Sequence, residues 1–313
     1  MTQTPKPAAS GFSRRDLLAA AAGAAILGAT PPLARAQDAA IATRPIPSSG
    51  EPLPVVGIGT AIIFDFVNDP AKYAERREVL QILVAGGGKL IDTAAAYGYA
   101  EERVGDLAAD LGNRDKLFLA TKYSSRADKE AANSSLQTSL KRLRTGRIDL
   151  MQAWNVGDPN FSLAQLRDWK AQGLCRYVGI TSSSEFQYAA LAQVLKREKP
   201  DFFQINYSVN DRAAESVLLP TAKDAGCAVL TNLPFGRNSL FKAVAGKPVP
   251  DWAKDIDATS WAQIFLKFNL SHPAVTAVIP GTDKPDYMRD NLNAGRGRLP
   301  DSAMRQRIIV AIA

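Results

Sequence analysis

Three polar residues of the chain have the types and the spacing of a proton-transfer site. Asp92 and Lys122 each directly follow a short apolar run that predicts a strand, and Tyr97 lies five residues after Asp92. A lysine beside a phenol disfavours the neutral acid and so lowers the pKa of the phenol, and a carboxylate beside the lysine keeps the ammonium charged and fixed. Each residue alone is commonly a helix cap or a packing residue. Together they would make Tyr97 a usable general acid.

The composition excludes several other chemistries. His272 is the only histidine among the 313 residues, which rules out His-based metal sites and Ser-His-Asp or Cys-His catalysis. Cys175 and Cys227 each begin an apolar run that predicts a separate buried strand, so we expect no disulfide. Basic residues alternate with acidic ones, which is typical of a solvated surface and gives no support to nucleic-acid binding. Nothing suggests an obligate partner, and a monomer is compatible with the sequence.

Residues 1–36 have the pattern of a twin-arginine signal peptide. The segment Ser13–Leu18 contains the arginine pair and opens an Ala-rich apolar run that ends at the cleavage pattern Ala34–Ala36. A retained membrane anchor is the alternative, but the apolar run is short and Pro31-Pro32 interrupts it. Cleavage would lower the formal net charge from +7 to +4, since four cations and one anion are lost. We expect the twin-arginine export machinery as a partner, a periplasmic or secreted protein, and no stable membrane insertion.

After a Pro- and Ser-rich linker, residues 37–52, short apolar runs alternate with longer amphipathic ones throughout residues 53–313. This alternation predicts an α/β fold built of βα units, and eight of them fit a single-domain (β/α)8 TIM barrel. A doubly wound sheet is the main alternative. Its dinucleotide fingerprint is incomplete here, because the turn Gly57–Ile62 lacks the third glycine.

The barrel interpretation places the polar cluster at one end of the fold. In such barrels, polar residues just after a strand project into the active-site mouth. The predicted strands are Val55–Thr60, Lys89–Asp92, Leu117–Thr121, Leu150–Ala153, Tyr177–Ile180, Phe202–Ile205, Ala228–Leu230 and Ala277–Ile279. The predicted helices are Lys72–Ala85, Glu101–Leu111, Lys129–Leu143, Leu163–Gln172, Phe186–Lys196, Ala214–Ala225 and Ser260–Leu270.

Several segments resemble the aldo-keto reductase family. Ile91–Glu101, which reads IDTAAAYGYAE, looks like the signature of that family, and Ala120-Thr121-Lys122 is similar to its lysine strand. Further matches follow in order at residues 148–152, 177–181, 203–208 and 278–282, so the resemblance spans about residues 53–293. It implies a TIM barrel that binds NAD(P)H across its C-terminal face. The hydride would pass to a small aldehyde or ketone, or return from the alcohol.

The resemblance also implies roles for individual residues. Tyr97 would protonate the forming alkoxide, tuned by Lys122 and Asp92. At one place the residue pattern supports the same conclusion without the resemblance. Gly-Thr precedes a helix that begins near Pro285, and the free backbone amides at the start of that helix could bind an anion. A simple N-capped helix is the alternative. The implied cofactor-binding residues are Gly59, Thr60 and Asp92; Thr181, Ser182 and Gln204 at the carboxamide edge of the nicotinamide; Leu233, Phe235 and Arg237 at the pyrophosphate; and Gly281, Thr282, Lys284 and Asn291 at the adenosine end.

One position departs from the family's catalytic pattern. Trp154 stands where the family has a histidine that donates a hydrogen bond to the substrate carbonyl. An indole has one N–H donor and no second nitrogen, and the neighbouring Asn155 could donate only if its loop turns the amide inward. Losing one preorganised donor typically costs on the order of 10²–10³ in rate. We therefore expect slow turnover, with a non-catalytic nicotinamide-binding barrel, a sensor or carrier, as the alternative function.

Two further departures concern the cofactor. Asn232 stands where the family has an aromatic residue that stacks on the nicotinamide, and Tyr287 where it commonly has an arginine for the 2′-phosphate. The basic residues Lys284 and Arg289 lie close to that second position. They favour NADP(H) over NAD(H).

Overall fold

The computed structural model describes residues 1–2 and 40–313 of the chain. Nearly all of the predicted signal peptide, residues 1–36, and the first residues of the predicted linker lie outside the described residues. Within the part that is described, no helix combines the length and apolar character that crossing a membrane requires.

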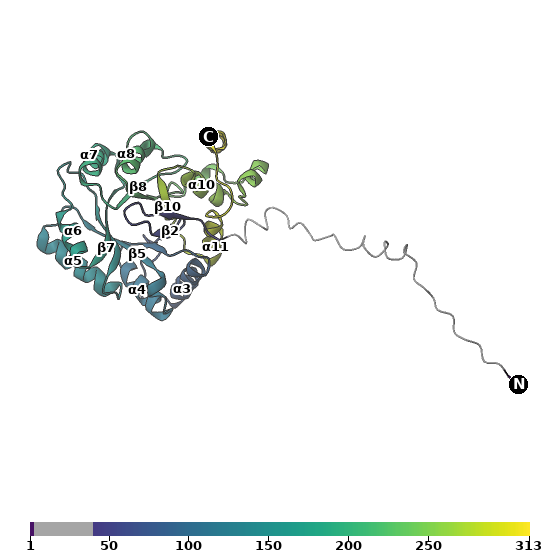
Figure 1. The fold of residues 1–313 in the computed structure, drawn as a ribbon, viewed down its shortest axis with the longest axis horizontal. Coiled ribbons are helices and arrows are strands. Elements are labelled where there is room, and N and C mark those ends of the chain that lie inside the picture. The colour runs from purple at the N-terminus through teal and green to yellow at the C-terminus, as the bar shows by residue number, and fades with distance from the viewer. Residues whose placement is uncertain (3–39) are drawn as a thin grey trace.

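Eight parallel strands form the centre of the structure (Figure 1). Each pairs with its neighbour in the chain, and parallel bridges from Val56 to Val278 and from Gly59 to Gly281 bring the first strand beside the last. The sheet is therefore a closed (β/α)8 barrel, as predicted, and not a doubly wound sheet. Its strands are β3 (Ile58–Gly59), β4 (Leu90–Asp92), β5 (Phe118–Ser124), β6 (Ile148–Trp154), β7 (Cys175–Ser182), β8 (Phe202–Asn206), β9 (Ala228–Asn232) and β10 (Val275–Val278).

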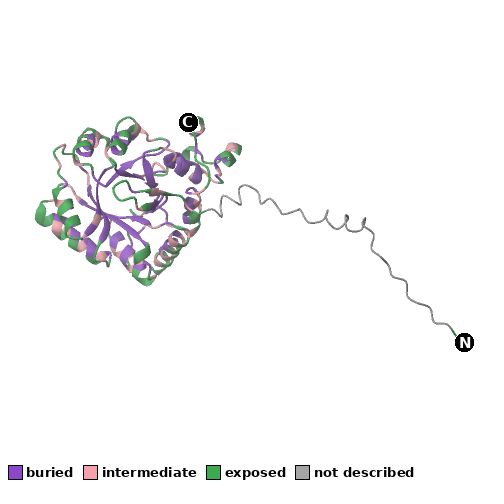
Figure 2. Ribbon diagram, viewed as in Figure 1, coloured by how far each residue is buried: buried purple, intermediate pink, exposed green. Residues whose placement is uncertain are grey.

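Helices surround the barrel, and buried residues concentrate on the strands and on the helix faces that cover them (Figure 2). Several helices begin at a side-chain cap: Asp69, for example, accepts a hydrogen bond from the backbone N of Lys72 at 3.0 Å, and Pro70 occupies the first turn. The helices are α3 (Pro70–Ala85), α4 (Ala100–Asp110), α5 (Lys129–Arg142), α6 (Ala164–Ala171), α7 (Tyr188–Glu198), α8 (Leu218–Asp224), α9 (Ser239–Ala243), α10 (Trp261–Leu270), α11 (Pro285–Asn293) and α12 (Ser302–Ala311).

A hairpin closes the N-terminal end of the barrel. Strands β1 (Thr43–Pro45) and β2 (Pro52–Pro54) pair antiparallel, and Ile46 and Leu53 join the apolar cluster inside the barrel. The linker predicted for residues 37–52 is therefore, from β1 onward, part of the folded body. Ile46 is an apolar residue within this Pro- and Ser-rich segment, and the barrel interior buries it together with Leu53, the residue that follows the segment.

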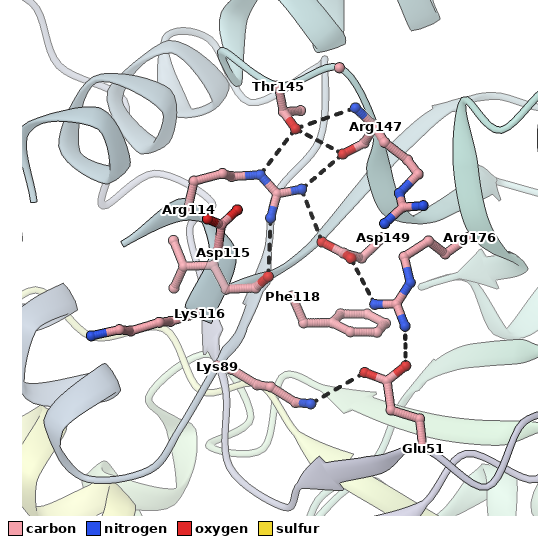
Figure 3. Close-up of a pocket in the computed structure, with 12 residues that line it drawn as sticks. Glu51, Lys89, Arg114, Asp115, Lys116, Phe118, Thr145, Arg147, Asp149 and Arg176 are labelled. Carbon is pink, nitrogen blue, oxygen red and sulfur yellow. Dashed lines mark hydrogen bonds and ion pairs between the residues drawn. The ribbon is translucent and has the colours of Figure 1, made fainter. Parts of the chain in front are cut away.

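Charged residues meet beneath this hairpin around a pocket of about 410 Å³ (Figure 3). Glu51 accepts hydrogen bonds from Lys89 at 3.3 Å and from Arg176, and Asp149 accepts from Arg176 at 2.9 Å and from Arg114 at 3.2 Å. The two carboxylates thus tie the hairpin to the first residues of the strands. This network lies at the opposite end of the barrel from the predicted active-site mouth.

One buried lysine fastens the C-terminal segment to the barrel. The ammonium of Lys267, on α10, donates hydrogen bonds to the backbone carbonyl oxygens of Arg296 and of Arg298, the latter at 3.0 Å. The residue is fully buried. Burial lowers the pKa of Lys267 to about 8, although the nearby Asp257 carboxylate opposes the shift.

We expect the free energy of unfolding of the wild type to rise, relative to that of Lys267→Met, between about pH 8 and pH 10.5. In this window the unfolded chain keeps a proton on Lys267 that the folded chain has lost, so raising the pH favours the folded state. The whole effect amounts to about 3 kcal/mol. Urea unfolding of both proteins at several pH values measures it, with Lys196→Met on the surface of α7 as control. A difference that does not change with pH would contradict the lowered pKa.

Candidate active site

The carboxyl ends of the parallel strands bring the predicted residues to one end of the barrel. Asp92 ends β4, and Lys122 lies within β5, two residues beyond the partner of Asp92. Trp154 ends β6, where it pairs in register with Thr181 of β7. Since parallel strands point the same way, these side chains converge on a single mouth.

The closest contact in this cluster is a buried ion pair. Lys122 Nζ lies 2.8 Å from Asp92 Oδ1 and 2.7 Å from Asp92 Oδ2, and both side chains are 4% exposed. The ammonium donates its third hydrogen bond to the carbonyl oxygen of Thr93 at 2.7 Å. Burial raises the pKa of the Asp92 carboxyl above its ordinary value, while the charge and hydrogen bonds of Lys122 oppose that rise. The lysine is therefore held rigidly by three acceptors.

Tyr97 lies over this pair. Lys122 Nζ is 5.2 Å from the centroid of the Tyr97 ring, a cation–π distance. The following residue, Gly98, has φ +57°, and a Cβ there would lie 2.2 Å from the Asp65 carboxylate, which accepts a hydrogen bond from the backbone N of Tyr99 at 3.0 Å. Only glycine fits this turn without strain. The structure thus brings the three predicted residues together, with the ammonium facing the ring of Tyr97.

Two glutamines form a chain of hydrogen bonds that ends on Asp92. Gln152 Nε2 donates to Gln204 Oε1 at 2.9 Å, and Gln204 Nε2 donates to Asp92 Oδ2 at 3.3 Å. Gly179 makes room for this chain, because a Cβ there would lie 3.0 Å from the side chain of Gln152. Gln204 was predicted from the sequence as a cofactor-binding residue. Gln152 was missed, although it lies two residues before Trp154 on β6 and therefore on the same face of that strand.

The loops after β6 and β7 are joined through Gln187. The hydroxyl of Ser182 donates to Gln187 Oε1 and accepts from the backbone N of Ser184 at 3.0 Å. Gln187 Nε2 donates to the carbonyl oxygen of Asn155 at 3.3 Å, and Asn155 has φ +58°. The hydroxyl of Ser182 is thus engaged within its own loop, and the half-buried Trp154 stands beside this network. Gln187 is a further residue of this site that no sequence pattern indicated.

A groove of about 740 Å³ lies between the loops that follow β9 and β10. It is lined by four of the residues predicted for the cofactor, namely Phe235, Gly281, Thr282 and Asn291. Thr282 Oγ1 is buried and has no hydrogen-bond partner among the described residues. The groove is therefore large enough for a ligand, and the Thr282 hydroxyl is available to form a hydrogen bond with it.

The other predicted cofactor residues lie outside the lining of that groove. Thr60 Oγ1 donates to the carbonyl oxygen of Asp92 at 3.1 Å, and Gly59 bridges to Gly281 across the barrel closure. Leu233 and Arg237 both have positive φ in the loop after β9. Through a hydrogen bond, a β-bridge and positive φ angles, these four residues determine the path of the backbone at the open end of the barrel.

The basic residues near the groove are engaged with acids. Lys284 Nζ lies 2.6 Å from Glu75, and Arg289 lies 3.0 Å from Glu78 and 2.7 Å from Asp286. Both glutamates come from α3, which packs against α11. A phosphate bound here would have to compete with these carboxylates.

The structure is a (β/α)8 barrel that gathers a carboxylate, a lysine and a phenol at the end where barrel enzymes have their active sites. The chain belongs to the aldo/keto reductase family, whose model matches residues 55–307. It is therefore an enzyme of the oxidoreductase class, as the sequence predicted.

Similar proteins cover most of the chain. Aldo-keto reductase str7 of Strobilurus tenacellus is 26% identical in a match that covers 72% of this chain and 78% of the relative. Protein tas of Escherichia coli (strain K12) is 26% identical in a match that covers 80% of this chain and 91% of the relative. The crystal structure of an aldo-keto reductase from Klebsiella pneumoniae in complex with NADPH matches with a TM-score of 0.71 at 23% identity, covering 86% and 94% of the two chains. That structural likeness confirms the fold.

Proposed function

We propose that the chain interconverts a small aldehyde or ketone and its alcohol with a nicotinamide cofactor, and that Tyr97 is the general acid and base. The observation that carries this proposal is the Lys122–Asp92 ion pair, buried at the open end of the barrel with the Tyr97 ring over the ammonium. A phenol that gives up its proton beside a fixed cation is stabilised as phenolate. Bound NADPH or NADH would supply the hydride.

In reduction, Tyr97 donates its hydroxyl proton to the carbonyl oxygen as that oxygen becomes an alkoxide. Lys122 stabilises the phenolate that remains, and Asp92 together with the Thr93 carbonyl keeps the ammonium in place. Trp154 lies at the position from which an additional hydrogen-bond donor would stabilise the negative charge that develops on the carbonyl oxygen. In oxidation of the alcohol, Tyr97 takes the proton back.

The groove between β9 and β10 fits the adenosine half of a dinucleotide. Thr282 has a hydroxyl without a partner in the described part of the chain, and α11 begins at Lys284-Pro285 with no side-chain cap. The free amides of its first turn would face an anion, which favours phosphate binding over the simple N-capped helix. We propose NADP(H) in preference to NAD(H). Three complexes of similar aldo-keto reductases, two from Klebsiella pneumoniae and one from Bombyx mori, contain NADP or NADPH.

Titration of the mature protein with NADPH should quench its tryptophan fluorescence at lower concentrations than titration with NADH. Trp261 lines the groove and Trp154 stands at the mouth, so a nucleotide that spans both places would affect their emission. Equal affinity for the two nucleotides would contradict the NADP(H) preference. Absence of quenching, together with no binding by calorimetry, would contradict the cofactor itself.

A non-catalytic barrel that senses or carries a nicotinamide is the second candidate function. The observation that favours it is Trp154 at the strand end where the family has a histidine. The two candidates make the same prediction for nucleotide binding. They differ in turnover of a broad aldehyde panel, which only the enzyme would show.

We also propose that residues 1–36 direct twin-arginine export to the periplasm or the outside of the cell. This route carries folded proteins, and a cofactor that must be loaded in the cytoplasm is a common reason to use it. Protein isolated from the exported fraction should therefore carry bound nucleotide, detectable by mass spectrometry after denaturation. Replacing both Arg14 and Arg15 by lysine should retain the protein in the cytoplasm. Export of that double variant would contradict the proposed signal.

A further inference from the structure

The pocket beneath the N-terminal hairpin, about 410 Å³ in volume, carries more positive than negative charge. Its lining contains five cations and three carboxylates, namely Lys89, Arg114, Lys116, Arg147 and Arg176 against Glu51, Asp115 and Asp149. None of the described residues that line it belongs to the proposed active site or to the cofactor groove. The pocket lies at the opposite end of the barrel, so the proposed function does not account for its charge.

The paired part of this lining already has one positive charge in excess. Glu51 accepts hydrogen bonds from Lys89 at 3.3 Å and from Arg176. Asp149 accepts from Arg176 at 2.9 Å and from Arg114 at 3.2 Å. Two carboxylates therefore face three cations within the network that holds the hairpin.

Two further cations at the pocket have no side-chain partner in the described chain. Arg147 and Lys116 are exposed, and in Figure 3 no dashed line reaches the guanidinium of Arg147 or the ammonium of Lys116. The carbonyl oxygen of Arg147 accepts from Arg114 at 2.8 Å, which fixes the backbone beneath the free guanidinium. Asp115 offsets one of these charges. The lining thus keeps two positive charges that no described carboxylate balances.

The free hydrogen-bond donors at the pocket are of the kind that binds phosphate. All five N–H groups of the Arg147 guanidinium are free within the described chain, and Arg176 keeps three after its bonds to Glu51 and Asp149. Guanidinium groups bind phosphate oxygens in pairs. A phosphate monoester has three terminal oxygens and a charge of about −1.5 to −2 at pH 7, which matches the excess charge of the pocket. A carboxylate has two oxygens and a single charge.

We propose that this pocket binds a small molecule that presents a phosphate group, held by Arg147 and Lys116 with Arg176 as a further donor. The volume of about 410 Å³ lies within the range of small-molecule sites, so an organic group fits beside the phosphate. The inference goes beyond the proposed function, because the site and its ligand are separate from the nicotinamide cofactor and from the carbonyl substrate.

The bound phosphate would join segments that are distant in the chain. Lys116 belongs to the short helical turn Arg114–Lys116, Arg147 directly precedes β6, and Arg176 lies on β7. A ligand that binds only the folded arrangement of these residues stabilises the folded state. Binding should therefore also raise the midpoint of thermal unfolding.

Titration of the mature protein with inorganic phosphate and with ethyl phosphate tests the proposal. Calorimetry should give saturable binding to the wild type, and Tm should rise with ligand concentration. Arg147→Met and Lys116→Met should each raise the dissociation constant at least about tenfold, since each removes charge-assisted hydrogen bonds. Neither side chain has a polar partner in the described chain, so both variants should unfold at the wild-type Tm without ligand. The tighter of the two probes identifies free phosphate or a monoester as the ligand type, and either order supports the site.

Two further variants control for binding elsewhere. Arg126→Met removes an exposed cation from the loop after β5, at the other end of the barrel, and should keep the wild-type dissociation constant. Lys284→Met tests the cofactor groove as the place where phosphate binds. Affinity that falls in Lys284→Met but not in Arg147→Met would place the phosphate in that groove and overturn the proposal.

Other results would also overturn the assignment. Unchanged affinity in both Arg147→Met and Lys116→Met, an equal loss in Arg126→Met, or no saturable binding of either probe would each exclude the site. Succinate carries two charges on separate carboxylates, and binding of succinate more tightly than both phosphates would exclude phosphate as the group recognised. None of these results bears on the proposed function, which is tested by nucleotide binding and carbonyl turnover.

Discussion

Replacing Tyr97 by phenylalanine should lower kcat for aldehyde reduction by about 10³-fold while leaving the dissociation constant for NADPH unchanged. A positioned general acid contributes about 10²–10⁴-fold, and Tyr97→Phe removes only the hydroxyl that would deliver the proton. The ring that faces Lys122 Nζ at 5.2 Å is kept. The Lys122–Asp92 pair should therefore survive the substitution.

Tyr99→Phe is the matched control for this prediction. Tyr99 lies two residues further along the same loop, and 48% of it is exposed to solvent. It should behave as the wild type in both turnover and binding. Equal turnover by wild type and Tyr97→Phe across a broad aldehyde panel would contradict the role of Tyr97.

Lys122 is a less informative target than Tyr97. Removing its ammonium would leave Asp92 as a buried carboxylate without its cation, and breaking such a pair typically costs about 3–5 kcal/mol of stability. Loss of activity in Lys122→Met would therefore mix misfolding with lost chemistry. The Tyr97 hydroxyl, by contrast, forms no hydrogen bond among the described residues, so Tyr97→Phe keeps the packing of the ring against the core.

The sequence predicted the barrel and the meeting of Asp92, Tyr97 and Lys122 for one physical reason. Short apolar runs and longer amphipathic runs differ in the spacing of their apolar residues, so the local pattern predicts strands and helices. The carboxyl ends of parallel strands then lie at the same end of the barrel. Two residues that follow adjacent strands then lie close together without any knowledge of side-chain directions. Family membership confirmed the fold and the class of enzyme.

Other features depend on contacts that no local pattern contains. Ile46 lies in the Pro- and Ser-rich segment and Leu53 stands between two prolines directly after it, and only the barrel interior explains their burial. Lys284 appeared free to meet a phosphate, yet Glu75, more than two hundred residues earlier, binds it. The direction of the Gln204 amide follows from Gln152 and Asp92 on two other strands. Such pairings become visible only when the chain is folded.

Replacing Trp154 by histidine should raise kcat for carbonyl reduction by roughly 10²–10³-fold, the amount that one preorganised donor to a developing oxyanion contributes. Trp154 ends β6, half-buried, in register with Ser124 on one side and Thr181 on the other, so its backbone is fixed by both neighbours. The following Asn155 carbonyl accepts hydrogen bonds from Ser125 at 2.9 Å and from Gln187 at 3.3 Å. A histidine should therefore occupy the same place.

Two controls separate the donor from the bulk of the side chain. Trp154→Phe keeps an aromatic ring but has no N–H, so its turnover should stay at or below that of the wild type. Trp154→Ala opens the mouth without adding a donor and should not reproduce the gain of Trp154→His. If Trp154→His binds NADPH as the wild type does but shows no gain in turnover, the chain lacks more than one donor, and the binding barrel becomes the better account. A gain confined to Trp154→His would instead mean that Asp92, Tyr97 and Lys122 are already competent for catalysis, with carbonyl polarisation as the limiting step.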